Sequence, residues 1–445
     1  MNPARPPVPD RLSTGLEGLD YILGGGLPRG RVYLVEGTPG TGKTTLALQF
    51  LLEGARQGEA GLYFALSESR AELEAVARSH GWSLDPFTTR EVVPTRQATE
   101  PDEPYTIFHP SEVELGETIK IICQEVEKQK PLRVVIDSLA EMRLLAQEPL
   151  VYRRQILALK QFFVGRNCTA LLLDDRPSST NDQHFHSLVN GILLLDQTTP
   201  VYGAKRRQLE VVKLRGVKYL DGLHDFTIQT GGLVVYPRLV AAEHPAPFER
   251  SPFASGLAEL DALLGGGLER GTSTLVMGSS GVGKSTLAAQ YALTAAERGE
   301  RAVVYLFDEG SDNFLARTTG LGMNLRPHIE AGRVALCPIN PAQLSPGQFA
   351  QQVRACVENE KSSVVVIDSL NGYLNAMPGE RWLLVQLHEL LSYLDQRGLV
   401  SLLIMAQHGL VGSHMETPVD VSYLADTVLL LRYFEAMGEV RKAIS

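Results

Sequence analysis

Hydrophobic and polar positions follow the same plan twice along the chain. Short apolar runs, such as 32–35 and 274–277, are each followed by a segment of helical periodicity, such as 46–50 and 287–291. A short apolar run between turn signals is typical of a buried strand, and strands that alternate with helices favour a parallel sheet. The pattern therefore predicts an α/β fold in which each half of the chain forms a mostly parallel, twisted sheet flanked by helices.

The repeat extends beyond this general plan. Residues 13–27 reappear in altered form as 254–268, with the first glycine shifted by 256 − 15 = 241 positions. A later Gly-rich loop is shifted by the same amount, since 278 − 37 = 241. A constant offset over separate motifs indicates two homologous domains joined head to tail. The segment 236–252 is rich in proline and small residues and is typical of a linker, so we expect domains at 1–244 and 245–445.

Composition and charge limit the classes of function. The 445 residues are 44% hydrophobic and 21% charged, as in an ordinary globular protein, and the net charge of −9 argues against nucleic acid as the main partner. No apolar run approaches the length of a membrane span, and the N-terminal residues lack the apolar segment of a signal peptide, so we expect a cytoplasmic protein without a membrane partner. The four cysteines are far apart and form no C-x-x-C pair, which argues against a zinc site.

The two Gly-rich loops carry the clearest chemistry. Residues 37–44 (GTPGTGKT) and 278–285 (GSSGVGKS) both satisfy G-x-x-x-x-G-K-[ST], and each lies between a predicted strand and a predicted helix. In this P-loop, backbone N–H groups surround phosphates, the lysine reaches the β- and γ-phosphate oxygens, and the hydroxyl binds Mg²⁺. A nucleoside triphosphate is therefore the expected ligand. The candidate contacts are Thr38, Pro39, Gly40, Thr41, Gly42, Lys43, Thr44 and Thr45 in the first copy, and Ser279, Ser280, Gly281, Val282, Gly283, Lys284, Ser285 and Thr286 in the second.

Each copy also has a later apolar strand that ends in an acid. The run 134–136 ends at Asp137 and the run 364–367 ends at Asp368. One such strand alone is often simply core, but its recurrence after both loops indicates the Walker B strand that holds Mg²⁺ in P-loop proteins. The expected metal ligands are Thr44 with Asp137, and Ser285 with Asp368.

An acidic position between loop and Walker B strand is equivalent in both copies. Glu68 lies 68 − 37 = 31 residues after the first loop glycine, and Glu309 lies 309 − 278 = 31 residues after the second. A carboxylate there can orient and deprotonate the water that attacks the γ-phosphate, the alternative being a solvated strand end. Further along each copy, Asp174-Asp175 and Gln407-His408 end the next core strand. Similarity to RecA-like ATPases, in which this strand end senses the γ-phosphate, implies that they are second-rank candidates for that contact.

Three further segments establish a family resemblance. They are 15–30 (GLEGLDYILGGGLPRG), 77–82 (ARSHGW) and 213–216 (KLRG). With the loop at 37–44, they resemble the KaiC family of RecA-like ATPases, and the resemblance covers nearly the whole chain as two domains. It implies tandem RecA-like P-loop NTPase domains, ATP and Mg²⁺, and a two-tiered homo-hexameric ring with ATP at the subunit boundaries. The best-known members are circadian clock kinases, which hydrolyse ATP in one ring and autophosphorylate in the other.

The same resemblance assigns roles to residues outside the loops. Lys213 and Arg215 become cations that the neighbouring subunit inserts into an ATP site, where a trans cation accelerates phosphoryl transfer. Without the resemblance, two cations at this spacing are more often a solvated strand face. Ser79 and Leu214 are further implied contacts to the nucleotide.

The sequence departs from the clock kinases at four points. The first copy has Ser67 before Glu68 where the clock proteins have two acids, whereas the second keeps the pair as Asp308 and Glu309. Of the phosphorylated Ser-Thr pair only Ser422 remains, as a candidate phosphoacceptor. The second copy ends at Ser445, so we expect it to lack its C-terminal strand with the second pair of trans cations. The partner-binding tail of the clock proteins is expected to be absent too.

The principal hypothesis is a Mg²⁺-dependent, ATP-hydrolysing ring whose nucleotide state selects protein partners, with a KaiB-like protein as the candidate partner. Three alternatives remain open. They are a serine/threonine autokinase that modifies Ser422, a scaffold that binds ATP without hydrolysing it, and a DNA-dependent ATPase of the RecA or RadA type. The acidic balance and the lack of a basic, aromatic-interleaved loop disfavour the last of these.

Overall fold

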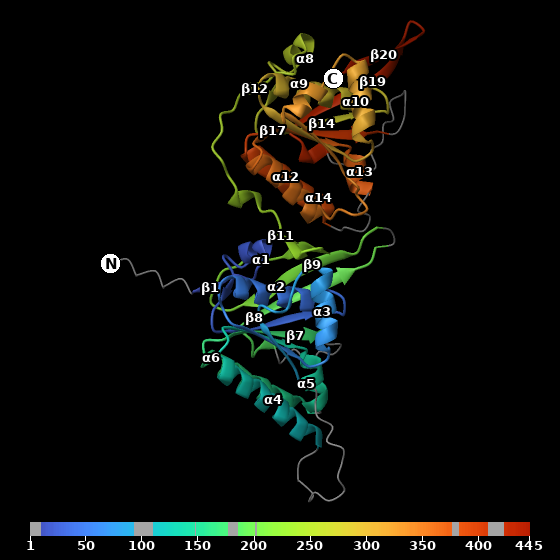
Figure 1. Cartoon of the computed structure of the whole chain (residues 1–445). Helices are drawn as coiled ribbons and strands as arrows, with labels where there is room; N and C mark the ends of the chain where they lie inside the picture. The colour runs from blue at the N-terminus through green and yellow to red at the C-terminus, as the bar shows by residue number, and fades with distance from the viewer. Residues whose placement is uncertain are drawn as a thin grey trace, which may run out of the picture. The chain divides into compact units, whose positions relative to one another are not determined.

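The computed structural model describes residues 10–92, 110–146, 148–176, 186–200, 203–375, 382–407 and 422–445 (Figure 1). These residues form two compact units, and the main boundary between the units falls between Arg238 and Leu239. The boundary expected from the sequence, 244/245, lies six residues later (244 − 238 = 6). The difference arises because the short 3₁₀ helix η2 (Ala241–Glu243) packs in the second core, where the backbone N–H of Ala241 donates to Glu389 Oε2 at 3.1 Å.

The first unit is built on a nine-stranded sheet in the order β11-β10-β9-β8-β3-β7-β6-β4-β5. Pairing is parallel from β8 to β5 and antiparallel from β8 to β11, so the mostly parallel sheet predicted from the sequence is present with an antiparallel extension. Its strands are β3 (Val32–Gly37), β4 (Gly61–Ala65), β5 (Thr88–Glu91), β6 (Arg133–Asp137), β7 (Thr169–Asp175), β8 (Gly191–Thr198), β9 (Arg206–Leu214), β10 (Leu223–Gln229) and β11 (Gly232–Tyr236), with the small separate pair β1 (Arg11–Leu12) and β2 (Leu27–Pro28).

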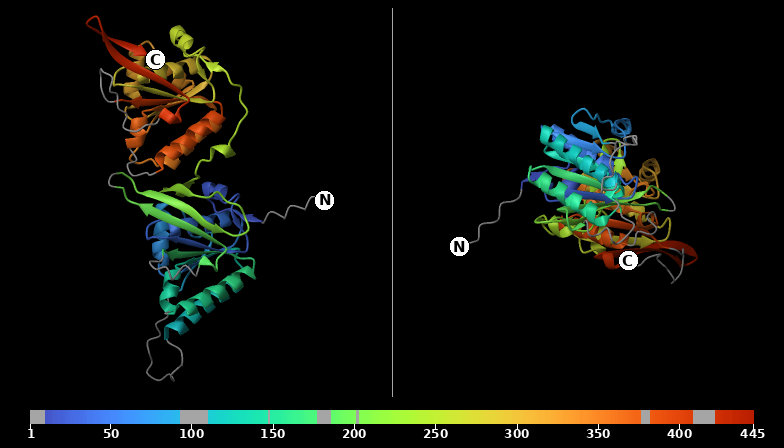
Figure 2. Two further views of the ribbon diagram at one scale, coloured as in Figure 1. Left: turned by 180° about the vertical axis from the view of Figure 1, so that it is seen from behind. Right: turned by 90° about the horizontal axis from the view of Figure 1, so that it is seen from below.

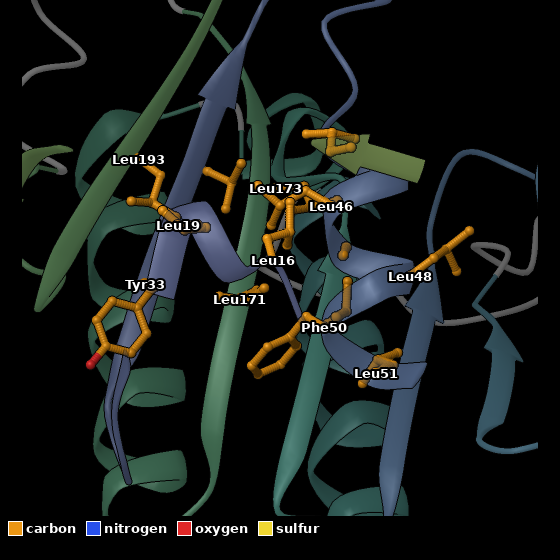
Figure 3. Packing of buried hydrophobic residues seen from close by; sticks show 14 of the residues in the cluster. Leu16, Leu19, Tyr33, Leu46, Leu48, Phe50, Leu51, Leu171, Leu173 and Leu193 are labelled. Atoms are coloured by element: carbon orange, nitrogen blue, oxygen red, sulfur yellow. The ribbon is translucent and has the colours of Figure 1, made fainter. Parts of the chain in front are cut away.

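Helices cover both faces of this sheet. One face packs against α1 and α2 in a single apolar cluster that includes Leu19, Phe50 and Tyr33, as Figure 3 shows from close by. The opposite face packs against α4, α5 and α6, which Figures 1 and 2 show gathered on the side of the sheet away from α2. The helices are α1 (Glu17–Ile22), α2 (Lys43–Arg56), α3 (Arg70–Ser79), α4 (Pro110–Gln129), α5 (Leu139–Ala146) and α6 (Pro149–Val164).

The second unit repeats the plan with a seven-stranded sheet in the order β16-β15-β17-β18-β14-β19-β20. All its pairs are parallel except β19 with β20. The strands are β14 (Thr272–Gly278), β15 (Arg301–Leu306), β16 (Val334–Pro338), β17 (Ser362–Asp368), β18 (Val400–Ala406), β19 (Thr427–Ala436) and β20 (Glu439–Ile444), with the small pair β12 (Pro252–Phe253) and β13 (Leu268–Glu269). The helical elements are α8 (Ala258–Leu263), α9 (Lys284–Glu297), α10 (Ser311–Gly320), α11 (Arg326–Glu330), α12 (Pro346–Glu358), α13 (Leu370–Asn375), α14 (Leu383–Gln396) and the 3₁₀ helix η3 (Ser422–Leu424). Two apolar clusters lie on opposite faces of this sheet, as in the first unit.

Strand register shows which residues of the two units correspond, and it revises one expectation. Leu195 in β8 and Leu431 in β19 both lie opposite the first glycine of their P-loop. Leu209 in β9 faces Leu195, and Ile444 in β20 faces Leu431. The second domain therefore has a strand, β20, where the sequence analysis expected none, and this strand corresponds to β9 up to Leu209. The position of Lys213, four residues further on (213 − 209 = 4), has no counterpart among residues 439–445.

Candidate functional site

The first P-loop connects the end of a buried strand to the start of a helix. β3 ends at Gly37 and α2 begins at Lys43, and the turn between them is closed by a hydrogen bond from the N–H of Thr41 to the carbonyl of Thr38 at 3.2 Å. Gly42 has φ 104°, in the region that favours glycine, and a Cβ there would lie 2.8 Å from Ile228 Cδ1. The backbone N–H groups of this turn and the N-terminus of a 14-residue helix together form a site suited to an anion.

The P-loop lysine of the first domain makes two kinds of contact. Its Nζ donates to the carbonyl of Gly37 at 2.8 Å and forms an ion pair with Asp175 Oδ1 at 2.9 Å. The lysine side chain is 10% exposed and the aspartate side chain is 50% exposed. Asp175, a second-rank candidate of the sequence analysis, ends β7 directly opposite Gly37 of the loop strand and therefore lies beside the P-loop lysine.

Asp137 is close to the loop, as a Walker B residue should be. One of its oxygens, Oδ2, accepts hydrogen bonds from Thr44 Oγ1 at 2.8 Å and from Tyr63 OH at 2.6 Å. Burial raises the pKa of Asp137, and the two hydroxyl donors oppose that rise. Tyr63 was not identified from the sequence, although a tyrosine within a buried strand requires a partner for its hydroxyl.

Glu68 differs from the other acids of the site because one of its oxygens is unused. Its Oε2 is buried and has no hydrogen-bond partner among the described residues. Burial raises the pKa of Glu68, and the negative charge of Asp137 raises it further. An unpartnered carboxylate oxygen next to a P-loop is available to accept a hydrogen bond from a water molecule.

The second P-loop has the same backbone but different neighbours. Lys284 Nζ donates to the carbonyl of Ser279 at 2.9 Å, and burial lowers the pKa of Lys284. Within the described part of the chain, Lys284 forms no ion pair. The residue opposite Gly278 in the next strand is Ala406, so it occupies the register position that Asp175 occupies in the first domain.

The acidic pair Asp308 and Glu309 of the second domain is bound to partners within that domain. Asp308 accepts a hydrogen bond from the hydroxyl of Ser369, and Glu309 forms an ion pair with Arg317. Asp368 has one buried oxygen, Oδ2, without a partner in the described ranges. Burial raises the pKa of Asp368, and a hydrogen bond from Ser285 opposes the rise.

Each domain offers a divalent cation one hydroxyl and one carboxylate, Thr44 with Asp137 and Ser285 with Asp368. In the described ranges no group of three or more His, Cys, Asp or Glu side chains could hold a metal ion. Magnesium typically binds one or two protein ligands together with phosphates and water. The unpartnered Oδ2 of Asp368 and the oxygen-only donor sets therefore suit Mg²⁺ that arrives with a nucleotide.

Two contacts to the P-loops were missed in the sequence analysis. Gln197 in β8 donates from its side-chain amide to the carbonyl of Pro39 at 3.0 Å. In the second domain Lys442 of β20 donates to the carbonyl of Gly281 at 3.3 Å and lies over the ring of Tyr433. Gln197 comes from the strand beside its loop strand, and Lys442 comes from β20, which is separated from its loop strand by β19. Only the arrangement of the sheet brings these residues to the loops, so no local motif could have revealed them.

Lys213 and Arg215 lie away from the P-loop of their own domain. Lys213 faces Ile192 in β8, which neighbours Leu34, three residues before Gly37 in the loop strand (37 − 34 = 3). Since a strand rises about 3.3 Å per residue, Lys213 lies roughly 10 Å back along the sheet from the loop. Its Nζ donates to the carbonyl of Val189 at 3.0 Å, and Arg215, just after β9, donates to the carbonyl of Ser187 at 3.0 Å.

The remaining candidates lie at separate places. Leu214 is buried at the end of β9, and Ser79 donates from its hydroxyl to the carbonyl of Val76 at the end of α3. Ser422 begins η3 and is exposed, as a phosphoacceptor requires. His408 lies outside the described residues, and Gln407 donates its N–H to the carbonyl of Gly278 at 3.0 Å. No helix among the described residues has the length and apolar character to cross a membrane.

Comparison with known proteins yields one family twice. The family model described as "ATPase: KaiC" matches residues 12–240 and again residues 253–445. The circadian clock protein KaiC3 of Synechocystis is 26% identical over 443 residues, which cover 98% of this chain and 86% of that protein. The circadian clock oscillator protein KaiC of Parathermosynechococcus lividus is 26% identical, covering 97% and 80% of the two chains, and that of Prochlorococcus marinus is 27% identical, covering 98% and 87%.

Proposed function

The chain belongs to the KaiC family of ATPases, and we propose that it is a Mg²⁺-dependent, ATP-hydrolysing ring protein whose nucleotide state selects a protein partner. The observation that carries this proposal is the pair of P-loops, each with its lysine turned toward the loop carbonyls and its hydroxyl beside a buried Walker B aspartate. Its relatives are named as circadian clock proteins, which supports a switching role and makes a KaiB-like protein the first partner to test.

In the first domain we assign a separate role in ATP hydrolysis to each residue of the site. Lys43 and the loop N–H groups would hold the phosphates, and Thr44 and Asp137 would hold Mg²⁺. Glu68 accepts a hydrogen bond from the attacking water through its unpartnered oxygen. When bound, Mg²⁺ offsets the negative charge on the transferring phosphoryl group.

Lys213 and Arg215 complete the site in a neighbouring copy rather than in their own. Lys213 lies roughly 10 Å back along the sheet from Gly37, and Arg215 lies beyond it, so neither is next to the P-loop of its own domain. In a head-to-tail ring one edge of a subunit faces the opposite edge of the next, which favours contact between these cations and the nucleotide of the neighbouring subunit. A trans cation that stabilises the transferring phosphoryl group raises the rate by about 10³ to 10⁵ in other phosphoryl-transfer enzymes. We propose a hexamer, with ATP at the boundaries between subunits.

The second domain is proposed to retain ATP longer than the first. Its acids Asp308 and Glu309 are engaged by Ser369 and Arg317, so neither is as available to orient water as Glu68 is. Binding through Lys284, Ser285 and Asp368 remains complete. ATP in this ring would then serve mainly to hold subunits together.

Phosphate release and assembly test the proposal together. The full chain and its Lys43→Ala and Lys284→Ala variants are incubated with γ-labelled ATP and Mg²⁺, and free phosphate, labelled protein and particle size are measured. We expect ATP-dependent hexamers and slow phosphate release that falls at least tenfold in Lys43→Ala and less in Lys284→Ala.

Other outcomes favour the alternative functions. Label that stays on the protein and is lost in Ser422→Ala supports the autokinase. ATP-dependent hexamers without phosphate release support the non-hydrolysing scaffold. Strong stimulation of release by single-stranded DNA supports a DNA-dependent ATPase. A chain that neither binds nor hydrolyses ATP contradicts the proposed function altogether.

A further inference from the structure

The two P-loop lysines differ in what they bind within their own domain. Lys43 forms an ion pair with Asp175 at 2.9 Å, whereas Lys284 has only the carbonyl of Ser279 among the described residues. The difference follows from the register, because Gly37 faces Asp175 and Gly278 faces Ala406. Two otherwise matching loops thus meet a carboxylate in one domain and a methyl group in the other.

A carboxylate on the P-loop lysine occupies the place of a phosphate. The ammonium group of this lysine is the group that reaches the β- and γ-phosphate oxygens in P-loop sites. In the first domain a phosphate must therefore displace the Asp175 carboxylate before Lys43 can bind it. After displacement the aspartate still lies at the end of β7 next to Gly37, so its negative charge stays close to the terminal phosphate.

The resulting cost depends on which nucleotide binds. Both ATP and ADP must compete for Lys43, but ATP brings an additional negatively charged group to the side of the loop where Asp175 lies. Like charges in a partly buried site repel over this range, and the 10% exposure of the lysine side chain limits screening by salt. The repulsion is therefore larger for the triphosphate than for the diphosphate.

We propose that Asp175 is a specificity-determining residue that lowers the preference of the first domain for ATP over ADP, and that Ala406 leaves the second domain without this restraint. The proposal rests on the proposed function, because it assumes that both loops bind adenine nucleotides. A domain that binds ATP only moderately better than ADP reports the ratio of the two nucleotides, and a domain that strongly prefers ATP stays loaded. The register difference at one position thus gives the two rings different nucleotide responses.

The test measures binding rather than turnover, one domain at a time. In full-length chains that carry Lys284→Ala, the affinities for the non-hydrolysable β,γ-imido analogue of ATP and for ADP are measured with Mg²⁺ by calorimetry, with and without Asp175→Asn. The change to asparagine keeps the size of the side chain and removes its charge. Asp196→Asn is the matched control. Asp196 lies in β8, on the other side of β3, is about as exposed as Asp175, and forms an ion pair with Arg176.

We expect Asp175→Asn to strengthen binding of the triphosphate analogue by roughly fivefold and binding of ADP by roughly twofold, within the range of a partly exposed ion pair. Asp196→Asn should change both by less than about twofold. In chains that carry Lys43→Ala, the reciprocal change Ala406→Asp should weaken the triphosphate analogue more than ADP at the second domain.

The proposal is overturned if Asp175→Asn changes neither affinity, changes both equally or weakens the triphosphate analogue. In any of those cases nucleotide binding itself is intact, and the proposed function stands. If neither nucleotide binds to a Lys284→Ala chain that melts like its parent, with or without Asp175→Asn, the proposed function of the first domain fails as well.

Discussion

At the scale of single residues, the first site is distinguished by a tyrosine hydroxyl that contacts Asp137, the proposed Walker B aspartate. Tyr63 and Thr44 both donate to the same oxygen of Asp137, at 2.6 and 2.8 Å. The equivalent of Tyr63 in the second domain is Val304, because Tyr63 lies two residues before the strand residue opposite Asp137 and Val304 two before the one opposite Asp368. The first domain therefore has a donor that supports the ionised form of its aspartate, and the second domain has none at that position.

Tyr63→Phe tests whether this donor supports metal binding. Burial raises the pKa of Asp137 and the tyrosine opposes that rise, so its loss should raise the pKa further and weaken Mg²⁺. In a Lys284→Ala background we expect the Mg²⁺ concentration for half-maximal hydrolysis to rise by roughly three- to tenfold at neutral pH, with a smaller increase at higher pH.

Tyr33→Phe is the control for that experiment. Tyr33 is another fully buried tyrosine of the same sheet, and its hydroxyl donates to the carbonyl of Pro28 at 2.7 Å. Its loss should reduce stability to a similar extent without changing the Mg²⁺ requirement. Equal Mg²⁺ dependence in the parent and Tyr63→Phe chains would show that Thr44 alone is sufficient to orient Asp137.

At the scale of elements, a buried ion-pair network in the first domain joins the first residue of β6 to α2 and to the residues that precede β4. Arg133, the first residue of β6, is fully buried and donates to Glu59 at 2.6 Å and to the carbonyl of Phe50 in α2 at 2.7 Å. Arg29 binds the other oxygen of Glu59 at 2.7 Å. The pair recurs in the second domain as Arg270 with Glu300, but there the position of Arg133 is an apolar residue of β17.

Glu59→Gln should destabilise the first domain strongly, because it leaves the buried guanidinium of Arg133 without an anion. The expected loss is about 3 kcal/mol of unfolding free energy at pH 7, measured by urea denaturation. Glu117→Gln, which removes a pair that is 60% exposed on both sides, should cost less than about 0.5 kcal/mol. A loss of similar size in both variants would contradict the role assigned to burial.

The same network has a predictable dependence on pH. Burial alone would raise the pKa of Glu59, but the two arginines outweigh it and the net shift is downward. A carboxyl group with a lowered folded-state pKa stabilises the fold above its unfolded value near 4.3 and loses that contribution as the pH falls further. The parent should therefore lose more stability than Glu59→Gln between pH 5 and about pH 3.

Sequence alone was sufficient for the elements that repeat at a fixed offset. The two P-loops and their strands could be equated because they are 241 residues apart, and Glu68 could be equated with Glu309 because 309 − 68 = 241 as well. The offset falls to 368 − 137 = 231 at the Walker B strands, since the first copy has the longer connection there. The same offset of 231 also joins Asp175 to Ala406 (406 − 175 = 231), and the register agrees with it there. The offset changes again to 431 − 195 = 236 at β8 and β19, so only the hydrogen-bonded register shows that β20 matches β9. The side-chain partners of the acids were likewise beyond prediction, because they come from strands and helices that no motif marks.

At the scale of the whole molecule, the two domains have the same sheet plan but different nucleotide sites. The first domain has Glu68 with an unpartnered carboxylate oxygen, Lys43 in an ion pair with Asp175, and the cations Lys213 and Arg215. In the second domain Asp308 and Glu309 are bound to Ser369 and Arg317, and Lys284 forms no ion pair among the described residues. These contacts support the proposed division between a first domain that hydrolyses ATP and a second domain that retains it, and the proposal requires that a neighbouring subunit completes the first site.

Mixing two inactive variants tests that completion directly. Lys43→Ala removes the P-loop lysine of the first domain but keeps Arg215, and Arg215→Ala does the reverse. Both variants keep Lys284, because ATP at the second domain is proposed to hold the subunits together, and the hydrolysis followed is the part of the parent's phosphate release that each variant alone lacks. In a randomly mixed head-to-tail ring, roughly a quarter of the boundaries join an intact loop to an intact Arg215, so hydrolysis should recover to about a quarter of the parent value. If Arg215 acts only within its own subunit, each subunit remains defective and mixing restores nothing. Arg215 follows Leu214, which faces Gly191 and through it Tyr33, four residues before Gly37 in the loop strand (37 − 33 = 4). Because this position is distant from the P-loop of its own domain, we expect recovery, measured as phosphate release after the separately purified variants have exchanged subunits.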